Sequence, residues 1–206
     1  MFDVMNITSE QIIKNYDKFR SLCEKLGDRS LATLRLVDEL GEDLAMCPAS
    51  SRRDYHLAEP GGLVDHSLRV LQNALVYSKA FSWNLPKDSL ILSCLFHDIG
   101  KLGLPTKDGT FSKYYLPQDS DWHRDKLGEM YKYNKDMLHM KTPQRSVFML
   151  QHYGITLNHD EYLAILLNDG YVLDENKSYC LKEPLLAHVV MTADYISTRQ
   201  EKGEFR

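Results

Sequence analysis

Residues 97–101 read His-Asp-Ile-Gly-Lys and close an apolar run that begins at Leu90. An imidazole and a carboxylate at the end of such a run are costly to bury, because each loses its hydration unless another group satisfies it. A divalent cation satisfies both, since imidazole nitrogen and carboxylate oxygen are common ligands of Zn, Mn, Fe and Mg. The stretch therefore predicts a metal site at the end of a buried helix.

Two further side chains have contexts that suit the same ion. His66 lies near the start of a helix expected over residues 62–81, and Asp194 lies in the last expected helix. Neighbouring residues on a helix point about 100° apart, so His97 and Asp98 reach one ion only if it sits beside their helix. The other ligands must then arrive from other helices, and an all-helical bundle with an inward-facing site supplies that arrangement.

These contexts resemble the HD-domain metal-dependent phosphohydrolases, whose pattern is a His, then His-Asp, then a distant Asp. Residues 59–66 (Glu-Pro-Gly-Gly-Leu-Val-Asp-His) resemble the family's first motif, residues 95–101 its central motif and residues 192–194 (Thr-Ala-Asp) its last. The resemblance covers roughly residues 54–200. It implies that the metal ligands are His66, His97, Asp98 and Asp194. Alone, His66 also fits a satisfied core histidine, and Asp194 a surface carboxylate; their order and context favour ligands.

The resemblance favours one metal over two. Where two-metal relatives have a His before a Pro at a helix start, this chain has Thr142, and where they end a helix in His it has Asn168. A single divalent ion is therefore expected, with Mn, Mg, Zn, Co and Fe all open. His139 or His152 leaves a second site open. Single-metal relatives act mainly on phosphate monoesters or nucleotides.

Four residues are candidates for binding the substrate. Lys101 stands where some single-metal nucleotidases have an acidic residue, and its ammonium suits a phosphate oxygen; an ion pair with a surface carboxylate is the alternative. We expect Lys101 and Asp98 to be the catalytic residues, and the general base is Asp98 or another carboxylate near the metal. Arg145 lies near a helix N-terminus, where a cation is unfavourable unless an anion is close. His56, in a basic loop, and Tyr133, in an aromatic stretch, complete the set.

The spacing of apolar residues and caps predicts a mostly helical chain. Helices are expected over residues 8–25, 30–46, 62–81, 86–98, 127–138, 143–153, 159–168 and 183–199. Residues 103–127 are irregular and leave room for a short β-hairpin around residues 109–115. Residues 171–181 are expected to form a loop or a hairpin.

The fold class that follows is all-α, a single-domain helical bundle of the HD-domain type. Residues 1–50 are expected to form N-terminal helices that pack on the core. Residues 51–200 would form the metal-dependent hydrolase domain, and residues 201–206 a frayed tail.

The composition limits the partners and the cellular compartment that we expect. With 25 basic and 29 acidic residues, the net charge of −4 offers no large positive field for nucleic acid. The cysteines form no CxxC pair, which favours a reducing compartment. The first residues do not have the pattern expected of a signal peptide, and no apolar run reaches the length of a membrane span. We expect a cytoplasmic protein whose partner is a small phosphate ester. Neither a membrane nor a stable nucleic-acid partner is expected, and homo-oligomer formation is left open.

The predicted function is hydrolysis of a nucleotide or similar phosphate ester through a metal-activated water. Nucleoside monophosphates and triphosphates are preferred over cyclic or polymeric substrates. Two alternatives stay open. One is a phosphodiesterase or 3′–5′ exonuclease acting on cyclic or oligomeric nucleotides, and the other is a non-catalytic sensor that binds a nucleotide.

Overall fold

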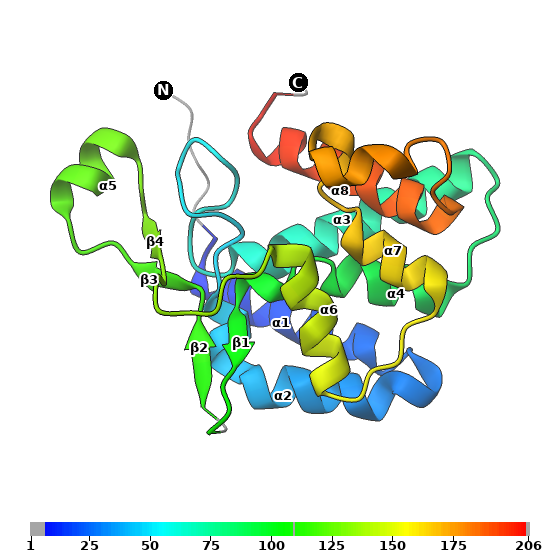
Figure 1. Cartoon of the computed structure of the whole chain (residues 1–206), viewed down its shortest axis with the longest axis horizontal. Coiled ribbons are helices and arrows are strands. Elements are labelled where there is room, and N and C mark those ends of the chain that lie inside the picture. The colour runs from blue at the N-terminus through cyan, green and yellow to red at the C-terminus, as the bar shows by residue number, and fades with distance from the viewer. Residues whose placement is uncertain (1–6, 109, 205–206) are drawn as a thin grey trace.

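The computed structural model describes residues 7–108 and 110–204, and most of this chain is helical (Figure 1). The α-helices are α1 (Ser9–Cys23), α2 (Ser30–Met46), α3 (Gly62–Ala80), α4 (Lys87–Phe96), α5 (Asp121–Leu127), α6 (Thr142–His152), α7 (His159–Leu166) and α8 (Leu185–Glu201). Short 3₁₀ helices are η1 (Gly27–Arg29), η2 (Ile99–Lys101), η3 (Gly170–Val172) and η4 (Asp174–Tyr179). This content confirms the predicted all-α class.

Two small antiparallel sheets interrupt the helices. Strand β1 (Gly103–Pro105) pairs with β2 (Phe111–Lys113), and β3 (Tyr115–Pro117) pairs with β4 (Tyr131–Tyr133). In Figure 1 both sheets lie on one side of the bundle, and α5 projects beyond the second. The first sheet flanks the turn in which a hairpin was expected, although Gly109 itself lies outside the described residues.

Helix α3 is central to the bundle and packs against α8, α4 and α1 (Figure 1). Its apolar positions are buried, as an amphipathic helix between two others requires: Leu63, Val64, Leu68, Val70, Leu71 and Ala74. The N-terminal helices share the same core, since the ring of Phe19 from α1 meets that of Phe96 from α4 edge-to-face at 5.4 Å. Among the described residues, no helix combines the length and apolar character that crossing a membrane requires.

The prediction of a helix over residues 127–138 is wrong. Helix α5 ends at Leu127, where Gly128 caps it with a φ of +66°, and the chain then extends into β4. The tyrosines at 131 and 133 pair with β3, which lies more than ten residues earlier in the chain, so local spacing alone did not reveal the partner. Residues 171–181, expected to be a loop or hairpin, contain two 3₁₀ helices.

The prediction of a frayed tail beginning at residue 201 is also wrong for residue 201 itself. Glu201 is the last residue of α8 and its side chain is fully buried. The charged composition of the tail concealed this, because a carboxylate with buried partners cannot be distinguished by composition from a solvated one. Residues 205 and 206 of that tail lie outside the described residues.

Gly100 joins the 97–101 turn to α6. A Cβ built on Gly100 would lie 2.4 Å from the carbonyl oxygen of Thr142 and 2.6 Å from the backbone nitrogen of Ser146. We expect Gly100→Ala to lower the free energy of unfolding by about 3 kcal/mol, because overpacking against backbone cannot be relieved by rotating a side chain. Urea denaturation measures it.

The matched control is Gly154→Ala, where the space is open but φ is +75°. That variant should lose only about 1 kcal/mol from backbone strain. Equal losses in the two variants would contradict the packing explanation for Gly100.

Candidate metal centre

Three helices bring the four predicted ligands together. His66 lies near the start of α3, His97 and Asp98 follow the end of α4, and Asp194 lies within α8. His66 Nε2 is 3.0 Å from Asp194 Oδ1, and His97 Nε2 is 3.5 Å from Asp98 Oδ2. The cross distances are 3.9 Å from His66 Nε2 to Asp98 Oδ2 and 4.0 Å from His97 Nε2 to Asp194 Oδ1. We call these four residues the ligand cluster.

Each histidine of the ligand cluster is fixed through its other ring nitrogen. His97 Nδ1 donates to the carbonyl oxygen of Cys94 at 2.8 Å, and His66 Nδ1 donates to both carboxylate oxygens of Glu201, at 3.0 and 3.1 Å. Both acceptors lack a proton, so both Nδ1 atoms carry one, and Nε2 is the ring atom that offers a lone pair to a cation whenever the imidazole is neutral.

Those two Nε2 atoms are buried and have no hydrogen-bond partner within the described part of the chain. The Asp194 oxygen is near enough to His66 Nε2 but is not placed in hydrogen-bond geometry. Two orphaned imidazole nitrogens facing two carboxylates form a donor set that fits a divalent cation. His66, His97 and Asp98 alone already have ligand atoms within 4.8 Å of one another.

The negative charge of the carboxylates in the ligand cluster is partly offset by a protonated histidine. Burial disfavours the charged form of His66, but Glu201 and Asp194 outweigh it and raise its pKa to about 10. Burial also opposes ionisation of Asp98, yet Lys101 and the two histidines hold the pKa of that carboxyl below its usual range. The pKa of Asp194 is lowered as well, against the effect of burial, mainly by His66. Without a metal, a protonated His66 therefore neutralises part of the carboxylate charge.

Comparison with known proteins assigns the chain to a family. A family model described as the HD domain matches residues 63–199, a span that contains the whole ligand cluster. The chain belongs to the HD-domain family. Members of that family are in general metal-dependent hydrolases, and this HD domain has a buried His/Asp group that can hold a divalent cation. Comparisons with curated proteins and with solved structures found no match.

Metal binding to this HD domain should release a proton from His66. Since the pKa of His66 is about 10 in the metal-free protein, a cation must displace that proton to reach Nε2. We expect about one proton released per ion, and an affinity that rises ~10-fold per pH unit between about pH 6.5 and 8.5. Calorimetric titration with Zn²⁺ in buffers of different ionisation enthalpy measures the proton count. An affinity independent of pH would contradict the charge balance described above.

Lys101 lies at the edge of the ligand cluster. Its Nζ is 2.5 Å from Asp98 Oδ2, and 15% of its side chain remains exposed. The pKa of Lys101 is raised, since Asp98 and neighbouring groups outweigh the burial that would lower it, so the ammonium stays protonated. Lys101 also lines a cleft of about 340 Å³ together with His56 and Tyr133. The structure thus places three of the predicted substrate residues around one cleft beside the cluster; their contact with substrate remains a prediction.

Arg145 has a different environment. It is almost fully buried, and its guanidinium donates to the carbonyl oxygens of Gly100, at 2.7 Å, and of Met140, and to the hydroxyl of Thr142 at 3.0 Å. It also stacks on the ring of Tyr114 at 3.8 Å. With these contacts in place, Arg145 fastens the 97–101 turn to the start of α6. These contacts use three of its five N–H donors, and phosphate binding by Arg145 remains a prediction.

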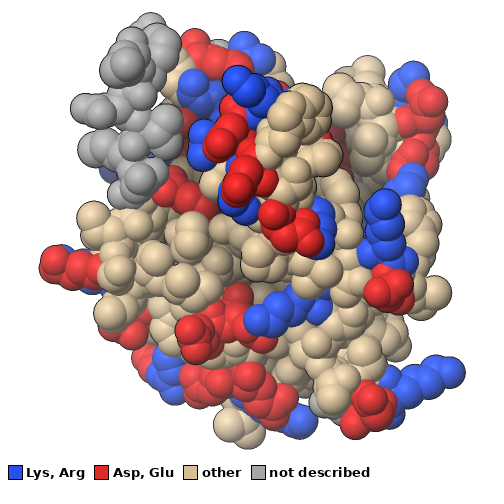
Figure 2. All heavy atoms as spheres, turned by 90° about the vertical axis from the view of Figure 1, so that its left-hand side faces the viewer, with Lys and Arg blue, Asp and Glu red and all other residues tan. Residues whose placement is uncertain are grey.

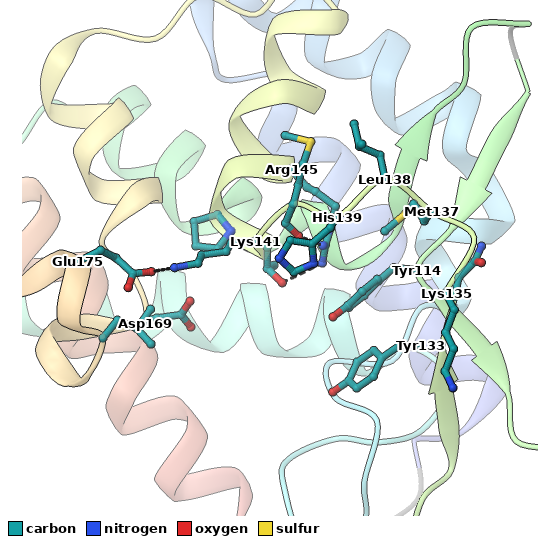
Figure 3. Close-up of a pocket in the computed structure, with 15 residues that line it drawn as sticks. Tyr114, Tyr133, Lys135, Met137, Leu138, His139, Lys141, Arg145, Asp169 and Glu175 are labelled. Carbon is teal, nitrogen blue, oxygen red and sulfur yellow. Dashed lines mark hydrogen bonds and ion pairs between the residues drawn. The ribbon is translucent and has the colours of Figure 1, made fainter.

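A second cleft, of about 560 Å³, shares Tyr133 with the first. Figure 3 shows Tyr114 and Tyr133 next to each other on one wall, and Asp169 together with the Lys141–Glu175 ion pair opposite. Burial among these walls and repulsion from Asp98 raise the pKa of Asp169 to about 6, although its side chain remains accessible from the cleft.

Sequence reasoning missed two acidic residues of this region. Asp169 directly follows Asn168, the residue that stands where two-metal relatives have a histidine. The side-chain amide nitrogen of Asn168 is 3.4 Å from Asp98 Oδ1. Glu201 was assigned to the tail. A signal for Glu201 was present, because it follows Asp194 by seven residues and therefore lies on the same face of a helix two turns later.

Proposed function

We propose that this HD domain is a metal-dependent phosphohydrolase that acts on a nucleotide. The observation that carries the proposal is the pair of orphaned Nε2 atoms on His66 and His97, facing two carboxylates beside a cleft that contains the ammonium of Lys101. A donor set for a cation and a fixed positive charge at an open cleft are the two elements that phosphoryl transfer needs.

A divalent cation held by the ligand cluster would lower the pKa of a bound water and polarise a phosphoryl oxygen. Lys101 faces the same region and stabilises charge that develops on the phosphoryl oxygens, because its ammonium is already positioned by Asp98. Asp98 is a poor base, since its pKa is depressed. Asp169, with a pKa of about 6, is ionised at neutral pH and better suited to accept a proton.

Tyr115 and Tyr133 of the second sheet, together with the adjoining Tyr114, favour a nucleotide as substrate. Tyr133 is 49% exposed, and the rings of Tyr114 and Tyr115 support it at centroid distances of 5.0 and 5.8 Å. Its hydroxyl is 3.1 Å from Ser51 Oγ, which limits the motion of the ring. A supported aromatic face beside a phosphate site suits a base, because stacking contributes about 1–3 kcal/mol per base.

A phosphodiester is the second candidate substrate, and one observation favours it. Tyr133 lines both clefts, so a chain with groups on either side of the reacting phosphorus has room in each. A short oligonucleotide fits this description better than a long polymer. On the face seen in Figure 2, acidic and basic side chains are interspersed with wide neutral areas rather than gathered into a basic track.

A substrate panel tests these proposals. Purified protein would be incubated with Mn²⁺, Mg²⁺, Co²⁺ or Zn²⁺ and with nucleoside monophosphates, triphosphates, cyclic nucleotides, a short oligonucleotide and ribose 5-phosphate. Release of phosphate from monophosphates, faster than from ribose 5-phosphate, is expected for a nucleotidase with a base site. Cleavage of the oligonucleotide alone would support the diester. Metal-dependent nucleotide binding with no product from any substrate would indicate a sensor and overturn the hydrolase.

A further inference from the structure

Glu201 accepts hydrogen bonds from two histidines, one in the ligand cluster and one that lines the neighbouring cleft. Its carboxylate accepts from Nδ1 of His66 at 3.0 and 3.1 Å and from Nδ1 of His56 at 2.7 Å. The two imidazole rings meet edge-to-face with centroids 4.6 Å apart. His66 belongs to the ligand cluster, whereas His56 lines the 340 Å³ cleft. One buried carboxylate therefore connects the predicted metal ligands with the predicted substrate cleft.

We propose that Glu201 is a positioning residue that holds His66 in its metal-binding tautomer and orients His56 in the cleft. The metal part rests on the proposed function. A neutral imidazole has one N–H, and a carboxylate can only accept, so the contact with Glu201 places the proton of His66 on Nδ1. Nε2 then keeps the lone pair that a cation requires. The same reasoning applies to His56, whose Nδ1–H is held by Glu201.

The surroundings of Glu201 suit this role. The side chain of Glu201 is fully buried, and the nearest arginine pairs more closely with another carboxylate. Arg69 Nε is 3.9 Å from Glu201 Oε1 but 2.5 Å from Asp65 Oδ2, so its stronger pairing is with Asp65. Both carboxylate oxygens of Glu201 accept from imidazole nitrogens, at 2.7 to 3.1 Å, which are contacts that an acceptor without a proton makes. A carboxylate behind a metal-binding imidazole fixes the ring and raises its basicity.

The position of Glu201 at the end of α8 adds a constraint. The same helix supplies Asp194 two turns earlier, so α8 contributes one direct ligand and one residue that orients a ligand from α3. A shift of α8 along α3 would change both contacts together. The packing between these two helices, the most extensive in the bundle, therefore sets the geometry of the ligand cluster.

Glu201→Gln tests the inference because the amide keeps the size of the side chain. It loses the charge and directs an N–H₂ group at an imidazole N–H. We expect the affinity for Zn²⁺, measured by calorimetry and by competition with a chelator, to fall about 10–100-fold. The matched control is Glu204→Gln, which removes a carboxylate from the same end of the chain, where it pairs with Lys202 and Arg199 and not with a histidine. Its Zn²⁺ affinity should equal that of the wild type.

A second measurement needs no variant at position 201. Nitrogen-15 NMR of the histidines in the Zn²⁺-loaded wild type should show His66 with a proton on Nδ1 and the metal on Nε2, with His66→Asn used only for assignment. Metal on Nδ1, a second Zn²⁺ per chain held by His56 and Glu201, or an unchanged affinity in Glu201→Gln would overturn the positioning role. If the wild type binds none of Mn²⁺, Mg²⁺, Co²⁺ and Zn²⁺, the proposed metal-dependent function is overturned instead, and the metal part of this inference with it.

Discussion

Asp98→Asn is expected to abolish both tight metal binding and phosphate release. Asp98 Oδ2 is within 3.9 Å of both orphaned Nε2 atoms, so it is the carboxylate that completes the group with His66 and His97. A residue that only orients a ligand is worth about 10–100-fold in metal affinity, so loss of the ligand itself should exceed about 100-fold. Calorimetry with Zn²⁺ or Mn²⁺ and an assay of released phosphate measure the two effects.

The fold must be shown to survive this substitution. Asn at position 98 leaves the Lys101 ammonium without its carboxylate, and breaking a buried ion pair costs about 3–5 kcal/mol. The double variant Asp98→Asn/Lys101→Met removes both charges and should regain most of that stability in urea denaturation, while remaining inactive. A stable double variant that still releases phosphate at the wild-type rate would contradict the role of Asp98 as a ligand.

The ligand cluster could be predicted because the order and contexts of three motifs resemble those of the HD-domain family, although His66 and Asp194 taken alone each fit another role. His97 and Asp98 end a buried helix, and His66 and Asp194 lie on amphipathic helices whose apolar spacing fixes which face turns inward. The structure brings all four together within a few ångströms. The family resemblance carried the assignment of the ligands, and local periodicity carried the prediction of the helices that present them. Neither depends on knowing the contacts between distant segments.

The features that escaped prediction depend on such distant contacts. Strand β4 forms only because β3 offers it a partner, and the Gly100 carbonyl oxygen that accepts from Arg145 Nε lies 45 residues earlier in the chain. Glu201 is separated from His56 and His66 by more than a hundred residues. A charged residue is assigned to solvent by default, and only the packing of α8 against α3 shows that this one is buried.

Lys101→Met should separate catalysis from metal binding. The variant keeps all four members of the ligand cluster, but it removes the positive charge that faces the predicted position of the phosphoryl group. Loss of one preorganised donor at a charge-developing centre typically costs about 10²–10³-fold in rate, so kcat/KM should fall by that amount. Metal affinity should be unchanged or higher, because a cation beside Asp98 no longer competes with the ammonium. Steady-state kinetics and calorimetry on the same preparation measure both.

The control for Lys101→Met is Lys113→Met. Lys113 is an exposed lysine of β2 that pairs with Asp43 at 2.5 Å and lines neither cleft, so its removal should change neither kcat/KM nor metal affinity. Loss of metal binding in Lys101→Met would show that the lysine maintains the cluster rather than contacting phosphate. Unchanged kcat/KM would show that the ammonium only neutralises Asp98. Because Lys101 contacts Asp98 and also lines the cleft, only a variant that loses turnover while it keeps the metal assigns the ammonium to the substrate.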